Sequence, residues 1–156
     1  MNENAITLEG LAAEQTKLEI TRFDYAWAWE LGTRLHALAI SENAPVAIQI
    51  RHGDDVVFST LCPGATIDNF DWTRRKAAVA HRFHRSSLSM RLEAEKKGYD
   101  FNTRFRLAPQ DYVASGGGVP LILKGGTLAG SVAVSGLPDV EDHRLITRCL
   151  LAQQQI

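Results

Sequence analysis

Cysteine is scarce in this chain, and the patterns that depend on it are missing. The two cysteines, Cys62 and Cys149, form neither a Cys-x-x-Cys metal spacing nor a disulfide framework. We therefore interpret both as small buried apolar residues. The N-terminus is polar and acidic without a signal-peptide pattern, and no apolar run approaches the length of a membrane span. These absences argue against a disulfide-rich secreted protein, and we expect a cytoplasmic location and no membrane partner.

Nucleotide-binding and hydrolase motifs are also missing. The run Gly116-Gly117-Gly118 has neither the G-x-G-x-x-G spacing nor the Lys-Ser ending of a phosphate-binding loop. No Gly-x-Ser-x-Gly elbow surrounds a serine, which argues against serine-hydrolase chemistry. The net charge is -1 and no recognised nucleic-acid module is visible, so we expect no nucleic-acid partner.

The remaining composition is ordinary for a globular protein. The chain has 156 residues, 45% of them hydrophobic and 22% charged, which is enough for one domain with a proper core. We expect a single domain over residues 1–156, with residues 1–20 as a peripheral N-terminal segment.

Charge is unevenly distributed along the chain. Residues 74–106 carry ten Lys and Arg against three Asp and Glu, while the rest of the chain is acidic. Such a basic segment is commonly a solvated face, or it pairs with a neighbouring subunit. The sharper interpretation is a site for an anion such as a carboxylate, a phosphate or a haem propionate.

Hydrophobic periodicity predicts alternating helices and strands. Two β-hairpins are expected, over residues 46–61 and 119–135, and Leu18–Phe23 alternates as a short strand would. Helical patterns cover residues 24–41, 71–97 and 139–150, whereas residues 99–106 show no clear period and suggest an ordered loop. The small residues of 127–135 predict that a helix or another subunit packs closely on that strand.

The central helical stretch contains the main candidate residue. Lys76 falls inside the apolar stripe formed by Trp72, Val79 and Phe83. A lysine in that position either extends along its stem to water or is held for a purpose. Further along the chain, His143 lies on the inner stripe of the last helix, at its N-terminal end.

Three groups of polar residues would form one anion pocket if the fold brought them together. The first includes Arg75, Lys76, His84, Ser86 and Ser87, the second is Gly116–Gly118, and the third includes Ser135, Asp142 and His143. His81-x-x-His84 places two imidazoles within reach of a metal, but the flanking cations oppose a divalent ion, so we expect no metal site.

The order and identity of these residues resemble one family, the "haem-degrading domain-containing" proteins related to the HbpS/GlcG group. The matching segments run in order from Arg74-Arg75-Lys76, Val79, Arg82-Phe83 and Ser86-Ser87 through Gly116-Gly117-Gly118-Val119-Pro120 to Val134-Ser135-Gly136-Leu137-Pro138 and Glu141-Asp142-His143. The resemblance implies a three-layer α-β-α sandwich with a mainly antiparallel sheet of about five strands, broadly profilin-like. It also implies a homodimer or higher homo-oligomer.

Three functions remain open at this point. The first is binding of a small anionic ligand near Lys76, the glycines and His143, with haem or a related tetrapyrrole as the cofactor implied by the resemblance. The second is a structural or interaction protein whose basic segment 74–106 is an oligomer interface. The third is an enzyme that degrades haem or acts on a small carboxylate metabolite through Lys76 or His143.

Overall fold

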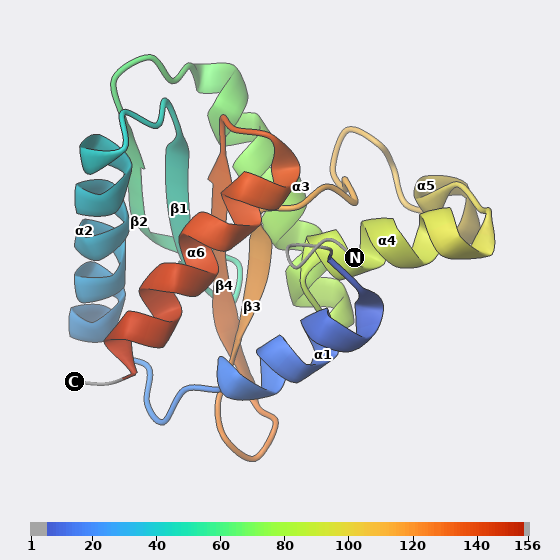
Figure 1. The fold of residues 1–156 in the computed structure, drawn as a ribbon, viewed down its shortest axis with the longest axis horizontal. Coiled ribbons are helices and arrows are strands. Elements are labelled where there is room, and N and C mark those ends of the chain that lie inside the picture. The colour runs from blue at the N-terminus through green and yellow to red at the C-terminus, as the bar shows by residue number, and fades with distance from the viewer. Residues whose placement is uncertain (1–5, 155–156) are drawn as a thin grey trace.

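A four-stranded sheet lies between helices in the computed structural model, which describes residues 6–154 (Figure 1). The strands are β1 Ala47–His52, β2 Asp55–Leu61, β3 Gly118–Ile122 and β4 Leu128–Ser135. They lie in the order β2-β1-β4-β3, and every neighbouring pair is antiparallel. The expected antiparallel sheet is therefore confirmed, with four strands where about five were expected.

Helices cover both faces of this sheet and make the predicted three layers. Their bounds are α1 Leu8–Lys17, α2 Tyr25–Ser41, α3 Ile67–Phe83, α4 Ser87–Lys97, α5 Phe101–Phe105 and α6 Asp139–Gln153. Helices α2 and α6 pack on one face and α3 on the other, while α4 and α5 extend away from the sheet (Figure 1). No helix among residues 6–154 is long and apolar enough to cross a membrane.

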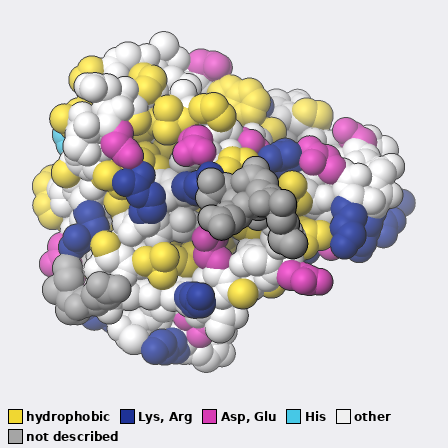
Figure 2. Space-filling model, viewed as in Figure 1, with side chains coloured by type: hydrophobic (Ala, Val, Ile, Leu, Met, Phe, Trp, Pro, Cys, Tyr) yellow, Lys and Arg dark blue, Asp and Glu magenta, His cyan; other side chains and the backbone are white. Residues whose placement is uncertain are grey.

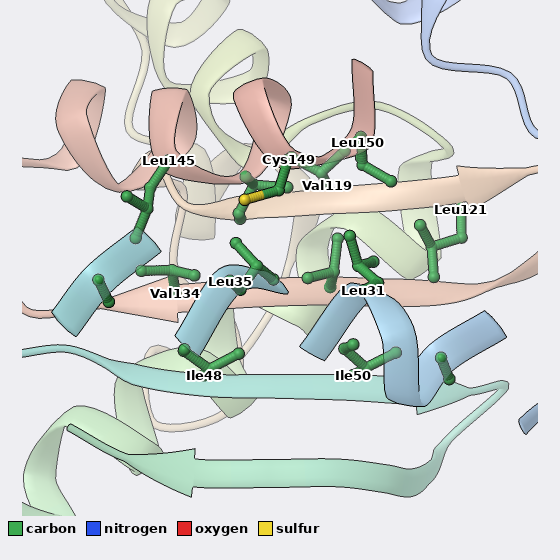
Figure 3. Packing of buried hydrophobic residues seen from close by; sticks show 14 of the residues in the cluster. Leu31, Leu35, Ile48, Ile50, Val119, Leu121, Val134, Leu145, Cys149 and Leu150 are labelled. Atoms are coloured by element: carbon green, nitrogen blue, oxygen red, sulfur yellow. The ribbon is translucent and has the colours of Figure 1, made fainter. Parts of the chain in front are cut away.

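Large apolar side chains fill the space between the sheet and the α2–α6 layer. Ile48 and Ile50 of β1 meet Leu31 and Leu35 of α2, and Cys149 belongs to the same cluster from α6 (Figure 3). Alternation along each strand sends these residues to one face, because successive side chains of a strand point in opposite directions. Both cysteines are buried without a disulfide, as expected from their isolation in the sequence.

The opposite face of the sheet carries small residues, and α3 packs closely against it. Ser131 and Ala133 alternate with the core residues of β4, and Ala77 and Ala80 are the buried small residues of α3. A Cβ atom at Gly118 would overlap the backbone of α3 at Lys76. The prediction that small residues in this strand mark close helix packing is thus confirmed, with α3 as the helix.

The edge of β3 is covered by other parts of the chain, and one of them is a segment that was predicted as a strand. The Ser87 hydroxyl accepts a hydrogen bond from the Gly118 N–H at 2.9 Å, and Pro120 has no N–H to satisfy. The N–H of Ile20 donates to the Ile122 carbonyl, also at 2.9 Å. The segment Leu18–Phe23, predicted as a strand, contributes only an isolated parallel bridge at Ile20. A single bridge forms because this segment meets only the last residues of β3.

A second apolar cluster holds α4 and α5 to the end of α3. Its buried members are Val79, Met90, Ala94 and Phe101, and the Phe83 and Phe105 rings lie 4.8 Å apart. Residues 99–106 were expected to be a loop, but α5 forms there because Asp100 caps it and its aromatic residues face this cluster. Of the N-terminal segment 1–20, residues 1–5 lie outside the described part of the chain.

Candidate functional site

Helix α3 places Lys76 against the sheet. The helix begins with a capping box between Thr66 and Asn69 and ends at His84, which adopts the left-handed conformation with φ of 55°. Between these ends, Lys76 lies on the same buried face as Thr73 and Ala80. Its side chain is 3% exposed, so the ammonium does not reach bulk solvent along its stem.

The Lys76 ammonium forms a buried ion pair with Asp142 of α6. Nζ lies 2.9 Å from Asp142 Oδ2 and 3.1 Å from the carbonyl oxygen of Val134 in β4. The other carboxylate oxygen of Asp142 accepts a hydrogen bond from the Leu137 N–H at 3.0 Å. Burial raises the pKa of the Asp142 carboxyl to about 6, and the neighbouring Lys76 charge opposes that rise. The pair thus joins the two helical layers around the end of β4.

The three glycines form the wall behind this pair. Gly117 has a φ of +122°, and a Cβ there would overlap the Val134 carbonyl oxygen and lie 2.9 Å from Lys76 Nζ. The Gly116 N–H donates to Asp139 Oδ2 at 3.0 Å, and the Gly118 N–H donates to Ser87. The N–H groups of Gly116 and Gly118 are therefore used by the protein itself. These glycines allow the chain to lie close to α3 and α6.

A pocket of about 310 Å³ opens beside the ion pair, and we call it the α3–α6 pocket. Its volume is at the lower end of the range for small-molecule sites, about 300–1,000 Å³. The residues that line it come from α3, the loop before β3, the turn after β4 and the first turn of α6: Asn69, Trp72, Lys76, Ser115, Ser135, Gly136, Leu137, Asp139 and Asp142. The Ser135 hydroxyl forms no hydrogen bond with any residue of the described chain.

Three other predicted residues do not line the pocket and have structural contacts of their own. The Arg75 guanidinium stacks 4.4 Å from the centre of the Trp72 ring and pairs with Asp71 at 3.0 Å. Ser86 caps α4 by accepting a hydrogen bond from the Ser89 N–H. Ser87 is fully buried between α4 and the glycine loop.

The two predicted histidines lie outside the α3–α6 pocket. His143 is buried, and its Nε2 lies 2.7 Å from Glu14 Oε1 on α1. His84 is exposed at the end of α3, where its carbonyl oxygen accepts a hydrogen bond from the Gln15 side chain. The structure therefore brings Lys76 and Ser135 into one pocket, places the glycines behind it, and leaves both imidazoles elsewhere.

Sequence reasoning missed part of this lining. Asp139 is the first residue of α6 and not its cap, which is Pro138; its side chain reaches the pocket and pairs with Arg91. Trp72 was noted only as a stripe residue, and Asn69 was not noted at all. The available signal was spacing, because Asn69, Trp72 and Lys76 recur at three and four residues and so share one face of α3.

The basic segment 74–106 is largely neutralised within the chain. Its ion pairs join Arg74 to Asp71 and Asp111, Arg85 and Lys97 to Glu93, and Arg91 to Glu95 and Asp139. In Figure 2, dark blue and magenta side chains are interspersed over much of the visible face, with a dark blue group at the α4–α5 end. Within residues 6–154, no three His, Cys, Asp or Glu side chains are arranged to hold a metal ion.

Comparison with known proteins gives consistent matches over most of the chain. A family model described as "Haem degrading protein HbpS-like" matches residues 23–150. A UPF0303 protein of Burkholderia thailandensis is 39% identical over 149 residues, which cover 96% of this chain and 90% of that protein. The crystal structure of the Ybr137w protein has a TM-score of 0.88 at 27% identity, covering 97% of this chain and 91% of that one. The crystal structure of a PduOC:heme complex has a TM-score of 0.70 at 17% identity, covering 86% and 95%, and shares the fold.

Proposed function

Because the chain belongs to the haem degrading protein HbpS-like family, we propose that it binds a small carboxylate ligand in the α3–α6 pocket, with tetrapyrroles as the candidate class. The observation that carries the proposal is the buried ammonium of Lys76. An ammonium has three N–H donors, and the protein uses two, for Asp142 and Val134. The third donor and the Ser135 hydroxyl are left for a ligand in the same pocket.

Haem fits this pocket through its propionates and not through its iron. Haem iron takes an axial ligand from His, Cys, Met or Tyr. None of these residue types lines the α3–α6 pocket within the described chain. A carboxylate, by contrast, takes hydrogen bonds from an ammonium and a hydroxyl, and charge-assisted bonds of this kind are the stronger ones. We therefore expect a tetrapyrrole to be held by a carboxylate arm at Lys76 and Ser135.

Titration with haem and with metal-free protoporphyrin IX tests this proposal, because only haem carries iron. Binding is followed by quenching of tryptophan fluorescence. We expect saturable binding of both compounds with affinities within about threefold, since the pocket supplies no iron ligand. The variant Ser135→Ala should weaken both at least about tenfold, because a hydrogen bond to a charged group contributes about 1.5–3 kcal/mol. Ser59→Ala, on the exposed side of β2, is the matched control and should bind as the wild type does.

Two results would contradict the proposal. One is binding of haem alone with a Soret shift typical of ligated iron, which would place the porphyrin at a histidine outside the pocket. The other is a non-saturating response to both compounds, which would mean that this protein has no tetrapyrrole site.

A second proposal is self-association, which an exposed aromatic face favours. Tyr25 and Trp29 of α2 are 66% and 63% exposed, and the Trp29 ring lies 5.6 Å from Phe58 of β2. Strand β2 is at the edge of the sheet and pairs only with β1 among the described residues, whereas the edge of β3 is covered. Exposed aromatics beside an open strand edge are typical of an interface. This face is a better candidate than the basic segment, many of whose cations are already paired.

Light scattering after size-exclusion chromatography tests the second proposal. We expect a dimer or larger species for the wild type, and a shift toward monomer for Trp29→Glu, which places a charge on the aromatic face. Lys96→Glu, in the basic segment, should leave the assembly unchanged. Dissociation by Lys96→Glu with an unaffected Trp29→Glu assembly would instead assign the interface to the basic segment.

A further inference from the structure

The α3–α6 pocket holds more negative than positive groups before any ligand enters. Lys76 is the only cation that lines it within the described chain, whereas Asp139 and Asp142 are both present. Asp139 has its own partners in Arg91 and the Gly116 N–H. Lys76 already pairs with Asp142, so a ligand carboxylate would be the second anion on a single ammonium. Two carboxylates that share one site cannot both stay ionised at low cost.

From this arrangement we infer that the pocket takes up its carboxylate ligand together with one proton, which Asp142 accepts from solvent. The inference rests on the proposed function of the pocket. In the bound state, the protonated Asp142 would donate its O–H to an acceptor oxygen while Lys76 neutralises the ligand. The ionised group at the ammonium thus changes from Asp142 to the ligand, and the net charge of the pocket stays the same.

The surroundings of Asp142 favour protonation there. Asp142 is 1% exposed, and burial raises its pKa to about 6. A second anion beside it raises the pKa further, so that Asp142 takes up a proton near neutral pH. Within residues 6–154, the elements around it bring no second cation into contact with it. Helix α3 contributes Lys76, the end of β4 and its turn contribute Ser135 and Leu137, and the loop before β3 contributes Gly117.

The other charged groups near Asp142 have partners or point elsewhere. On α6, His143 faces Glu14 of α1, and Glu141 is exposed and pairs with Arg144. Of the two pocket carboxylates, Arg91 of α4 contacts only Asp139, and its other partner is Glu95 outside the pocket.

Asp139 is a poorer proton acceptor than Asp142. Burial alone would raise its pKa, but the Gly116 N–H and the Arg91 guanidinium lower it below the usual value. A carboxylate that accepts these charge-assisted bonds stays ionised when an anion approaches. The two carboxylates of the pocket therefore divide the roles, with Asp139 as a fixed anion and Asp142 as the group that changes its protonation.

Calorimetric titration of the wild-type protein with protoporphyrin IX measures the proton directly. The titration is run at pH 7.5 in Hepes and in Tris, whose ionisation enthalpies differ, so that the difference in apparent heat gives the protons taken up. We expect about one proton per ligand bound. We also expect the binding affinity to fall by up to about tenfold for each pH unit between pH 7 and 8.5. The wild type carries this test, so it does not depend on any variant folding.

Variants at neighbouring positions of α6 locate the proton. Asp142→Asn keeps an acceptor for Lys76 but cannot titrate, and its affinity should be independent of pH in this range. Glu141→Gln, one residue earlier and outside the pocket, should keep the wild-type pH dependence. Saturable binding without proton uptake would overturn this inference and leave the proposed function standing. Absence of binding in both buffers would overturn the proposed function, and the inference with it.

Discussion

Nε2 of the buried His143 lies 2.7 Å from Oε1 of Glu14, a residue 129 positions earlier in the chain. The contact joins α1 to α6. The imidazole is 2% exposed and the Glu14 side chain 31% exposed, so the carboxylate covers the ring from the solvent side. His143 therefore has a structural partner on α1 and lies outside the α3–α6 pocket.

Removal of the Glu14 carboxylate should destabilise the protein. In Glu14→Ala the Nε2 atom of His143 would lose its partner in a buried place, and an unsatisfied buried polar group costs about 1–3 kcal/mol. We expect a loss of that size in the free energy of unfolding, measured by urea denaturation. Glu9→Ala, which removes an exposed acid from the first turn of the same helix, should cost about 0.5 kcal/mol or less. Equal losses in the two variants would mean that the His143 contact contributes nothing.

His143 shows which features of the site could be predicted from the sequence and which could not. Its position on the inner stripe of the last helix predicts burial, and the structure confirms burial. Periodicity reports only which face of a helix is covered. It does not identify the covering residue when that residue lies in a distant segment with a weak pattern, as Glu14 does. The histidine was therefore assigned to a ligand site, and α1 was regarded as peripheral.

Lys76 and the glycines show the same limit, because the sequence indicates constrained residues but not the residues that they contact. A lysine within an apolar stripe either extends to water or is held in place, and three successive glycines allow close backbone approach. In the structure Lys76 is held and the glycines are closely packed, and the fold brings both groups to the end of β4 together with Asp142. What the sequence did not provide is the pairing itself, because an acid in the first turn of a helix is equally well explained by the helix dipole.

The sheet was largely predictable because each of its two hairpins consists of short, mostly apolar runs joined by turn residues. The missing strand at Leu18–Phe23 and the unexpected α5 have a common cause. In both places tertiary contacts decide the local structure, with the edge of β3 in one case and the Phe83 cluster in the other. Propensity alone is a weak guide where neighbours override it.

Substitution of Gly117 should be far more damaging than substitution of a glycine with similar backbone geometry. Gly117→Ala combines a φ of +122° with overlap of the Val134 carbonyl oxygen, beside Lys76 Nζ. Gly125, in the β3–β4 turn, has a φ of +103° and open space around its Cα. We expect Gly125→Ala to cost about 1–3 kcal/mol from backbone strain alone. Gly117→Ala should cost at least about 4 kcal/mol, since the backbone around the ion pair must also move.

Chemical denaturation of both variants measures this difference, and circular dichroism reports whether the Gly117 variant folds at all. The comparison separates conformational strain, which the two sites share, from steric overlap, which only Gly117 has. Similar losses at the two positions would show that the wall behind Lys76 yields easily to an added methyl group.

The Lys76–Asp142 pair should make part of the stability depend on pH. The pKa of Asp142 is raised from 3.8 to about 6 in the folded protein, with burial as the main cause. The folded state therefore holds this proton more tightly than the unfolded state, and the free energy of unfolding falls as pH rises from about 4 to 6. Burial thus outweighs the attraction of Lys76, as is common for buried ion pairs.

The difference in stability between the wild type and Asp142→Asn isolates this effect. Carboxyls with lowered pKa values, such as those of Asp71 and Asp139, stabilise the folded state above their unfolded pKa in both proteins, so their contributions cancel. We expect the wild type to lose about 1–3 kcal/mol relative to the variant between pH 4 and 7, measured by urea denaturation at several pH values. A difference that grows with pH in favour of the wild type would mean that Lys76 outweighs burial. Asp142 would then stay ionised beside a bound anion, and any proton taken up with the ligand would have to bind to another group.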